Sequence, residues 1–175
     1  MIKVLISLMA FTLSASAQVA QQPDESVQEQ IVPESFVVTG NAVATKINWF
    51  WRTNISYTVV NKTGLNLYMG VMQNGMSLGS CSDVQSTQGG LPQLPSPTAI
   101  AYSAPAGSGP PRAIFVPASG KTSGLIIMNN CAAPNPGFPT APFSMTLMMS
   151  KANDWRHMVP LSVSADIPIR QISDE

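Results

Sequence analysis

The sequence predicts an all-β domain, folded as an antiparallel immunoglobulin-like β-sandwich of about seven strands. From Phe36 onward, short runs rich in Val, Ile, Thr, Tyr, Trp and Phe alternate with clusters of Gly, Pro, Asn and Ser, which is the pattern of strands and turns. No long window in this region repeats apolar residues at helical spacing behind a capping residue. A small closed β-barrel is the alternative architecture.

Residues 1–17 have the three-part layout of a secretory signal peptide. Lys3 is followed by an apolar run of about ten residues and then by small residues that end at Ala17. That run is too short to cross a bilayer as a helix, which needs about 20 residues. We therefore expect cleavage after Ala17, export to the periplasm or the extracellular space, and no transmembrane segment in the mature chain.

Residues 18–34 are rich in Gln, Glu, Asp and Pro and contain acids but no base. Such a segment cannot offset its ordering entropy by burial, so we predict a flexible acidic leader. Residues 35–175 then form the single β-sandwich domain. Up to Ser173 this domain has more bases than acids, and the bases are scattered singly. We interpret them as a solvated surface, and contact with an anionic partner is the alternative.

The two strongest strand candidates are neighbours, at residues 47–60 and 65–73. Apolar and polar residues alternate through 54–59, the period expected of a half-buried strand. The linker 61–64 has an Asn that can bond its own backbone and a Gly that can take positive φ. We therefore expect a tight antiparallel turn, with a cross-over between two sheets as the alternative.

The aromatic triplet Trp49, Phe50 and Trp51 lies at the start of the first candidate and makes both of its faces apolar. We expect burial of this segment, and an exposed aromatic platform is the alternative. The remaining strand candidates are residues 36–39, 113–116, 124–128, 143–150 and 157–164, with a continuation through 167–169.

Two proline-rich stretches interrupt the strands, at residues 82–111 and 132–142. Neither is expected to form a central strand, because proline lacks the N–H that a ladder needs. Loops of this length are functional or disordered, so we predict that they contact the partner. The bulky residues that we expect to anchor this contact are Pro95, Tyr102, Pro111, Arg112 and Phe138.

The two cysteines, Cys81 and Cys131, are predicted to form a disulfide, because exported chains with an even cysteine count usually pair them. Each cysteine comes just before a proline-rich stretch, so the bond would join the bases of both loops. In the chain-entropy picture it would stabilise the fold by about 3 to 4 kcal/mol.

The sequence offers little for catalysis. The chain has one histidine, His157, and no Gly-x-Ser-x-Gly elbow for a serine nucleophile. A carboxylate pair would have to come from Asp83, Asp154 and Asp166, which lie in or near predicted turns. One His and two distant Cys cannot supply the usual zinc ligands. We therefore expect neither an enzyme nor a cofactor.

Methionine is unusually frequent in the exported part of the chain. Met side chains fill irregular gaps in cores and cover pliable binding surfaces, and this is the interpretation that we prefer. The alternative is a Cu(I)-binding protein, because thioethers are soft ligands. Its ligands would be Met145, Met148, Met149, His157 and Met158.

These features predict a non-catalytic, exported binding or structural module. We expect it to be an accessory part of a cell-envelope or surface assembly. Its partner would be a protein or an envelope component and not a nucleic acid, because no run of bases interleaved with aromatics is present.

Overall fold

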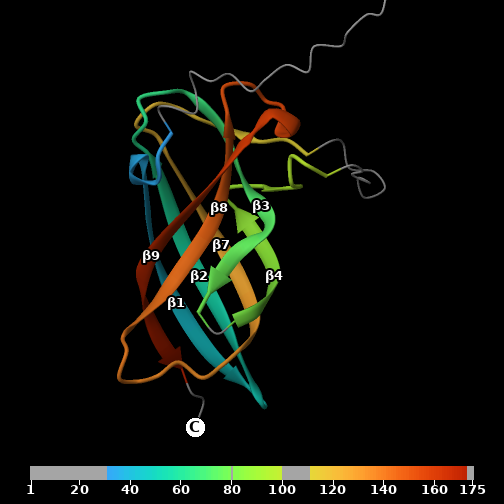
Figure 1. Ribbon diagram of the computed structural model, residues 1–175. Coiled ribbons are helices and arrows are strands. Elements are labelled where there is room, and N and C mark those ends of the chain that lie inside the picture. The colour runs from blue at the N-terminus through green and yellow to red at the C-terminus, as the bar shows by residue number, and fades with distance from the viewer. Residues whose placement is uncertain (1–30, 80, 100–110, 173–175) are drawn as a thin grey trace, which may run out of the picture.

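The computed structural model describes residues 31–79, 81–99 and 111–172, and this part of the chain is all-β, with nine strands and two single-turn 3-10 helices (Figure 1). The all-β class is as predicted, although the strands number nine instead of about seven. The predicted signal peptide and most of the predicted leader lie outside the described residues. Within the described residues, no helix has the length and apolarity to cross a membrane.

The strands vary in length from two to 14 residues. They are β1 (Phe36–Ile47), β2 (Phe50–Asn61), β3 (Leu67–Leu78), β4 (Cys81–Gly89), β5 (Gln93–Leu94), β6 (Ile114–Val116), β7 (Lys121–Cys131), β8 (Thr140–Ser150) and β9 (Val159–Ile172). The 3-10 helix η1 (Pro33–Ser35) precedes β1, and η2 (Trp155–His157) precedes β9.

All nine strands belong to one sheet that curls into a half-barrel (Figure 1). Its order is β4-β7-β2-β1-β9-β8-β3-β5, and β6 also pairs with β3. The strand that connects the two halves is β9. Its residues 159–168 pair antiparallel with β8, and its residues 169–172 pair parallel with β1. The sheet therefore turns from one half to the other along a single strand.

The tight antiparallel turn expected between β2 and β3 is not formed. The chain crosses over from one half of the sheet to the other, although both halves belong to one sheet and not to the two sheets of the alternative. β2 pairs with β1 and β7, whereas β3 pairs with β5, β6 and β8. The buried Asn61 holds the cross-over. Its Oδ1 accepts hydrogen bonds from the N–H and the hydroxyl of Thr63, and its Nδ2 donates to the carbonyls of Leu65 and Pro117. Asn61 thus forms hydrogen bonds within the 61–64 linker, as predicted. The linker, however, leads the chain to β3 in the other half of the sheet.

The predicted strand 47–60 is divided by a turn. β1 ends at Ile47, and Asn48 takes a φ of 53° before β2 begins at Phe50. Asn tolerates this left-handed conformation better than most residues, which makes a two-residue hairpin turn possible without Gly. β1 and β2 then pair along their full length.

The first proline-rich stretch is not a loop throughout, because its residues 82–89 belong to β4, which lies at one edge of the sheet. Prolines begin only at Pro92, so they do not prevent this strand. In the second stretch, Pro142 belongs to the central strand β8, contrary to the prediction. The Pro142 carbonyl accepts a hydrogen bond from the Gly79 N–H, and Gly79 lies just past the end of β3. The ring nitrogen of Pro142 points to the same side of the strand, beyond the last residue of β3. Its missing N–H therefore interrupts no hydrogen bond of the β3–β8 ladder.

The main core lies inside the curled sheet and is built from inward residues of all the long strands except β4. A smaller cluster of Leu94, Ala113, Met148, Trp155 and Met158 lies on the other face of β8. Ile31, which the sequence placed in the leader, is buried in the main core. The methionines Met69, Met76, Met128, Met145, Met148, Met149 and Met158 are all buried, which confirms core packing as their role.

Candidate functional site

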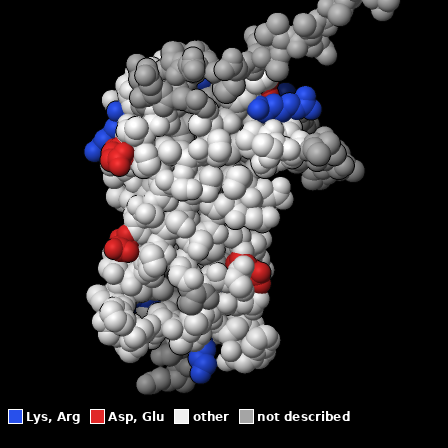
Figure 2. Space-filling model, viewed as in Figure 1, with Lys and Arg blue, Asp and Glu red and all other residues white. Residues whose placement is uncertain are grey.

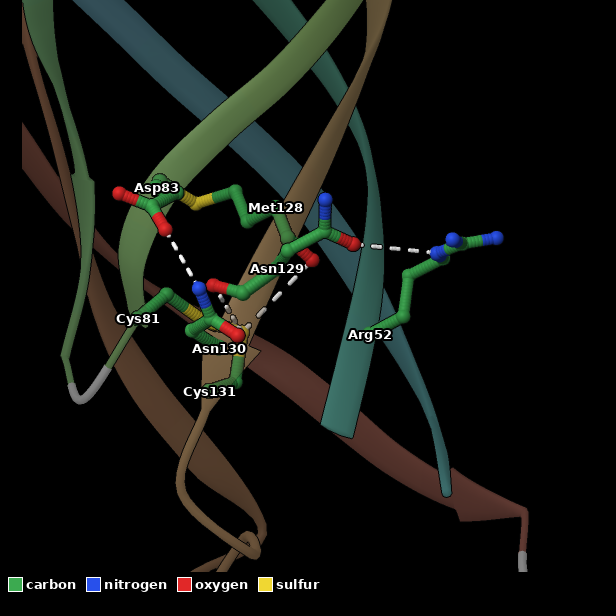
Figure 3. The surroundings of a disulfide bond; sticks show 7 residues. All are labelled: Arg52, Cys81, Asp83, Met128, Asn129, Asn130 and Cys131. Atoms are coloured by element: carbon green, nitrogen blue, oxygen red, sulfur yellow. Dashed lines mark hydrogen bonds between the residues drawn. A yellow bond between two sulfur atoms is a disulfide. The ribbon is translucent and has the colours of Figure 1, made fainter. Parts of the chain in front are cut away.

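Cys81 and Cys131 form the predicted disulfide, which joins the beginning of β4 to the end of β7 (Figure 3). Only the second predicted loop begins at this bond, because Cys81 is itself the first residue of β4. We call the surroundings of this bond the disulfide end, and define it as residues 48–50, the disulfide and the loop 132–139. Figure 1 shows the β1–β2 turn and the β7–β8 loop at the same end of the molecule.

A bulge in β7 places Cys131 at this end. Trp51 pairs with Cys131, but Thr53 pairs with Met128, so β7 has one more residue than β2 over this interval. Asn130, within the interval, takes a φ of 50°. Bulges re-aim side chains and end pairing, and here the bulge precedes the end of β7 at the disulfide.

Neighbouring strands hold both asparagines of the bulge (Figure 3). Arg52 Nε of β2 donates to Asn129 Oδ1 over 3.1 Å. Asn130 Nδ2 donates to Asp83 Oδ2 of β4 over 2.5 Å. The disulfide is therefore supported on both sides, and the chain that leaves β7 starts from a fixed point.

One cavity of this end has a volume of about 480 Å³ and lies beside the disulfide. Its lining is mainly apolar and comes from the loop 132–139 and the adjoining strand ends, including Leu78, Ala133, Phe138, Ala141 and Ile169. Among the described residues that line it, Asp166 alone carries a charge. The loop is tied down where the Gln171 amide donates to the Pro134 carbonyl. This cavity suits an apolar group with a basic or hydrogen-bond-donating neighbour.

A second, shallower hollow of about 530 Å³ lies on the other side of Cys131 and Ala132, against Trp49 and Phe50. Trp49 is 85 % exposed, and its ring meets the Phe50 ring edge-on at 5.2 Å between centroids. The expected burial of the triplet is wrong for Trp49, because the turn at Asn48 carries it out of the sheet. Trp51, in contrast, is half-buried and packs against the core.

The structure separates the predicted partner-binding residues. Phe138 is 67 % exposed and lies at the disulfide end. Pro111 and Arg112 lie by η2, at the other end of β8. Pro95 is buried, and Tyr102 lies outside the described residues. The sequence pointed to Phe138 by its bulk within a proline-rich loop, but it gave no signal that Trp49 would join it.

The structure also separates the alternative copper ligands. Met145 and Met149 point into the main core, whereas Met148, on the opposite face of β8, packs with Met158. His157 is exposed, and its Nδ1 is 2.8 Å from Asp154 Oδ2. No group of three or more His, Cys, Asp or Glu in the described ranges could hold a metal ion.

Within residues 31–79, 81–99 and 111–172, the one ion pair is the contact between Asp154 and His157, at the η2 end. The pKa of Asp154 is lowered, first by the hydrogen bond from the Arg156 N–H and then by the bond to His157. A carboxylate–imidazole pair is one part of a nucleophilic triad, but no described hydroxyl is hydrogen-bonded to His157.

Comparison with known proteins gives no relative from which a role could be transferred. The chain matches no known protein family and no curated protein sequence. The disulfide end must therefore be interpreted from its own chemistry, which is that of an exposed, mainly apolar surface with two aromatic side chains.

Proposed function

We propose that this chain is an exported, non-catalytic binding module of a cell-envelope or surface assembly, and that it contacts its partner through the disulfide end. The observation that carries the proposal is the pair Trp49 and Phe138. These exposed aromatic side chains lie beside two hollows that share Cys131 and Ala132.

Large aromatic side chains exposed next to an apolar cavity favour a partner surface. Trp is among the residues that contribute most to protein interfaces, and anchors of this kind are usually surrounded by a rim that excludes water. Exposing both side chains in a free module costs solubility, and a partner that covers them would remove this cost. Asp166 adds one polar point at which orientation could be fixed.

The proposal is narrower than the one from the sequence alone. It keeps the second proline-rich loop, now residues 132–139, and it adds the β1–β2 turn. Pro111 and Arg112, from the first proline-rich stretch, lie near η2 and are not part of the proposed contact surface. The length of β8 separates them from the disulfide end, which is about 35 Å at a rise of about 3.3 Å per residue.

Export is part of the same proposal. The signal-peptide pattern of residues 1–17 and the disulfide both suit an oxidising compartment, in the periplasm or outside the cell. A bond that fixes the base of the contact loop would be retained there without reduction by cytosolic thiols.

For the finer architecture we propose the immunoglobulin-like sandwich over the closed barrel. In its support, the consecutive strands β2 and β3 belong to different halves of the sheet, as consecutive strands of such sandwiches often do. A closed barrel would also need hydrogen bonds between the two ends of the strand order, β4 and β5. Among the described residues, no ladder joins these two strands.

Site-specific photo-cross-linking in the native organism tests the contact surface. A photoreactive phenylalanine analogue is placed at position 49 or 138, with position 115 as the control. Phe115 is also an exposed aromatic, 55 % accessible, but it lies on β6 against Tyr68. We expect the same adduct from positions 49 and 138 and none from 115. Equal adducts from all three positions, or none from 49 and 138, would refute the proposed surface.

A further inference from the structure

We propose a second binding site, at the η2 end of the molecule, for a phosphate group held by the guanidinium groups of Arg112 and Arg156. Both residues line a cavity of about 440 Å³, together with Pro111, Asn153, Asp154 and Trp155. The site is separate from the disulfide end and does not depend on the function proposed for it.

Buried neighbours bring the two arginines to one cavity. Arg112 precedes Ala113 and Arg156 follows Trp155, and both Ala113 and Trp155 belong to the smaller core cluster. The Ala113 N–H also donates to Asn153 Oδ1 over 3.2 Å, which joins the chain before β6 to the β8–β9 connection. The backbone at both arginines is therefore fixed by packing, while Arg112 and Arg156 themselves are exposed.

The Trp155 ring contacts the guanidinium group of Arg156. The Cζ atom of Arg156 lies 5.4 Å from the centre of the Trp155 ring, which is a cation–π contact. A guanidinium held against an aromatic face loses less conformational freedom when it binds an anion. The planar N–H donors of such a group match the oxygens of phosphate.

The charges near the cavity leave the arginines available. No described carboxylate forms a salt bridge with Arg112 or Arg156. Asp154, the one acid that lines the cavity, accepts from His157 Nδ1 and from the Arg156 backbone N–H. The pKa of Asp154 is lowered, first by the hydrogen bond from the Arg156 backbone N–H and then by the bond from His157, so these two donors hold its carboxylate. Lys151 adds a further exposed base to the same connection.

The space-filling view agrees with this distribution. Basic side chains lie at the upper right of Figure 2, where η2 lies in Figure 1, and most of the remaining described surface in that view is uncharged.

Titration of the mature protein with inorganic phosphate tests the site. Backbone and indole NMR signals are followed at constant ionic strength, with chloride as the reference anion. The variants are Arg112→Gln with Arg156→Gln, and Arg170→Gln is the control because Arg170 is exposed on β9, far from η2. We expect saturable shifts around Ala113 and Trp155, weakened at least about tenfold in the double variant and unchanged in the control.

A second arm separates free phosphate from a lipid headgroup. Co-sedimentation with phosphatidylglycerol vesicles is compared with phosphatidylcholine vesicles, using the same variants. Binding to phosphatidylglycerol that is lost in the double variant supports the site and assigns it to a headgroup, and loss of phosphate binding alone assigns it to free phosphate. If neither probe binds, or if Arg170→Gln weakens binding as much as the double variant, the proposal is wrong.

Discussion

The hydroxyl oxygen of Tyr57, in the middle of β2, accepts a hydrogen bond from the backbone N–H of Leu91 over 3.0 Å. This bond fixes the chain just after β4 ends, where it leaves the edge of the sheet for β5. Gly90 and Gly124 leave the necessary space, because a Cβ on either would lie 2.6 or 2.7 Å from the same hydroxyl oxygen. Tyr57 therefore connects the centre of one half of the sheet to the segment that leads into the other.

Replacing Tyr57 with Phe should lower the free energy of unfolding by about 1 to 3 kcal/mol, because it leaves the Leu91 N–H without its partner. Urea denaturation of the two proteins measures the difference. Tyr68→Phe is the matched control, since Tyr68 is half-buried and packs edge-on against Phe115. An equal loss in both variants would show that the Leu91 bond contributes nothing specific.

Alkaline pH should destabilise the protein through the same side chain. Burial raises the pKa of Tyr57 above its usual value of about 10, and the bond from Leu91 offsets this only in part. The unfolded chain therefore loses the proton first, so stability is intact below pH 10 and falls as pH rises further. Urea midpoints measured from pH 8 to 11 should fall less steeply for Tyr57→Phe. Parallel curves would contradict this explanation.

Replacing Gly124 with Ala should destabilise the fold more than Tyr57→Phe does. The added methyl group would lie 2.7 Å from the Tyr57 hydroxyl oxygen and 2.8 to 2.9 Å from atoms of its ring, so the ring or the backbone must shift. Overpacking of this kind costs about 1 to 3 kcal/mol, and the shift also disturbs the bond to Leu91. Gly64→Ala is a useful comparison, because Gly64 has a positive φ but open space around its Cβ position. Thermal unfolding of the unchanged protein, Gly124→Ala and Gly64→Ala measures both effects. The loss in Gly64→Ala reports backbone strain alone, and the loss in Gly124→Ala reports crowding at Tyr57.

Replacing Asn61 with Ala should cost about 2 to 4 kcal/mol, because it removes two acceptor and two donor contacts at a buried position. The carbonyls of Leu65 and Pro117 would lose their partner. Asn54→Ala on the exposed face of β2 provides the control and should change stability by less than about 0.5 kcal/mol. Denaturation midpoints of both variants measure this difference, and a small effect at Asn61 would show that the cross-over is held by packing alone.

Local patterns predicted the strands well where one face is buried. Ile55, Tyr57 and Val59 are buried as their alternation indicated. The sequence pattern did not predict β4, because its residues are mostly polar on both faces. An edge strand tolerates such a composition, and a loop has the same composition. The pairing of β2 was also missed, because partners from distant parts of the chain leave no trace in a short window.

The site was predictable only in part for a similar reason. Phe138 could be proposed from its bulk in a proline-rich loop, and the disulfide from the cysteine count. The sequence predicted that Trp49 continues a strand, because the turn at Asn48 has no Gly to mark it. The cavity beside the disulfide depends on ends of strands that are far apart in sequence, so no local pattern could indicate it.

The disulfide connects stability to the proposed contact, and its removal should affect the two ends of the molecule differently. Changing Cys81 and Cys131 together to Ser releases a link across 50 residues and should lower the free energy of unfolding by about 3 to 4 kcal/mol. At a temperature where circular dichroism shows the variant folded, the loop 132–139 would have lost the bond at its base. Cross-linking from position 138 should then fall severalfold, while phosphate shifts around Ala113 and Trp155 should persist. Loss of both responses together would indicate a global change and not a local role for the bond, because β8 separates the two ends by its full length.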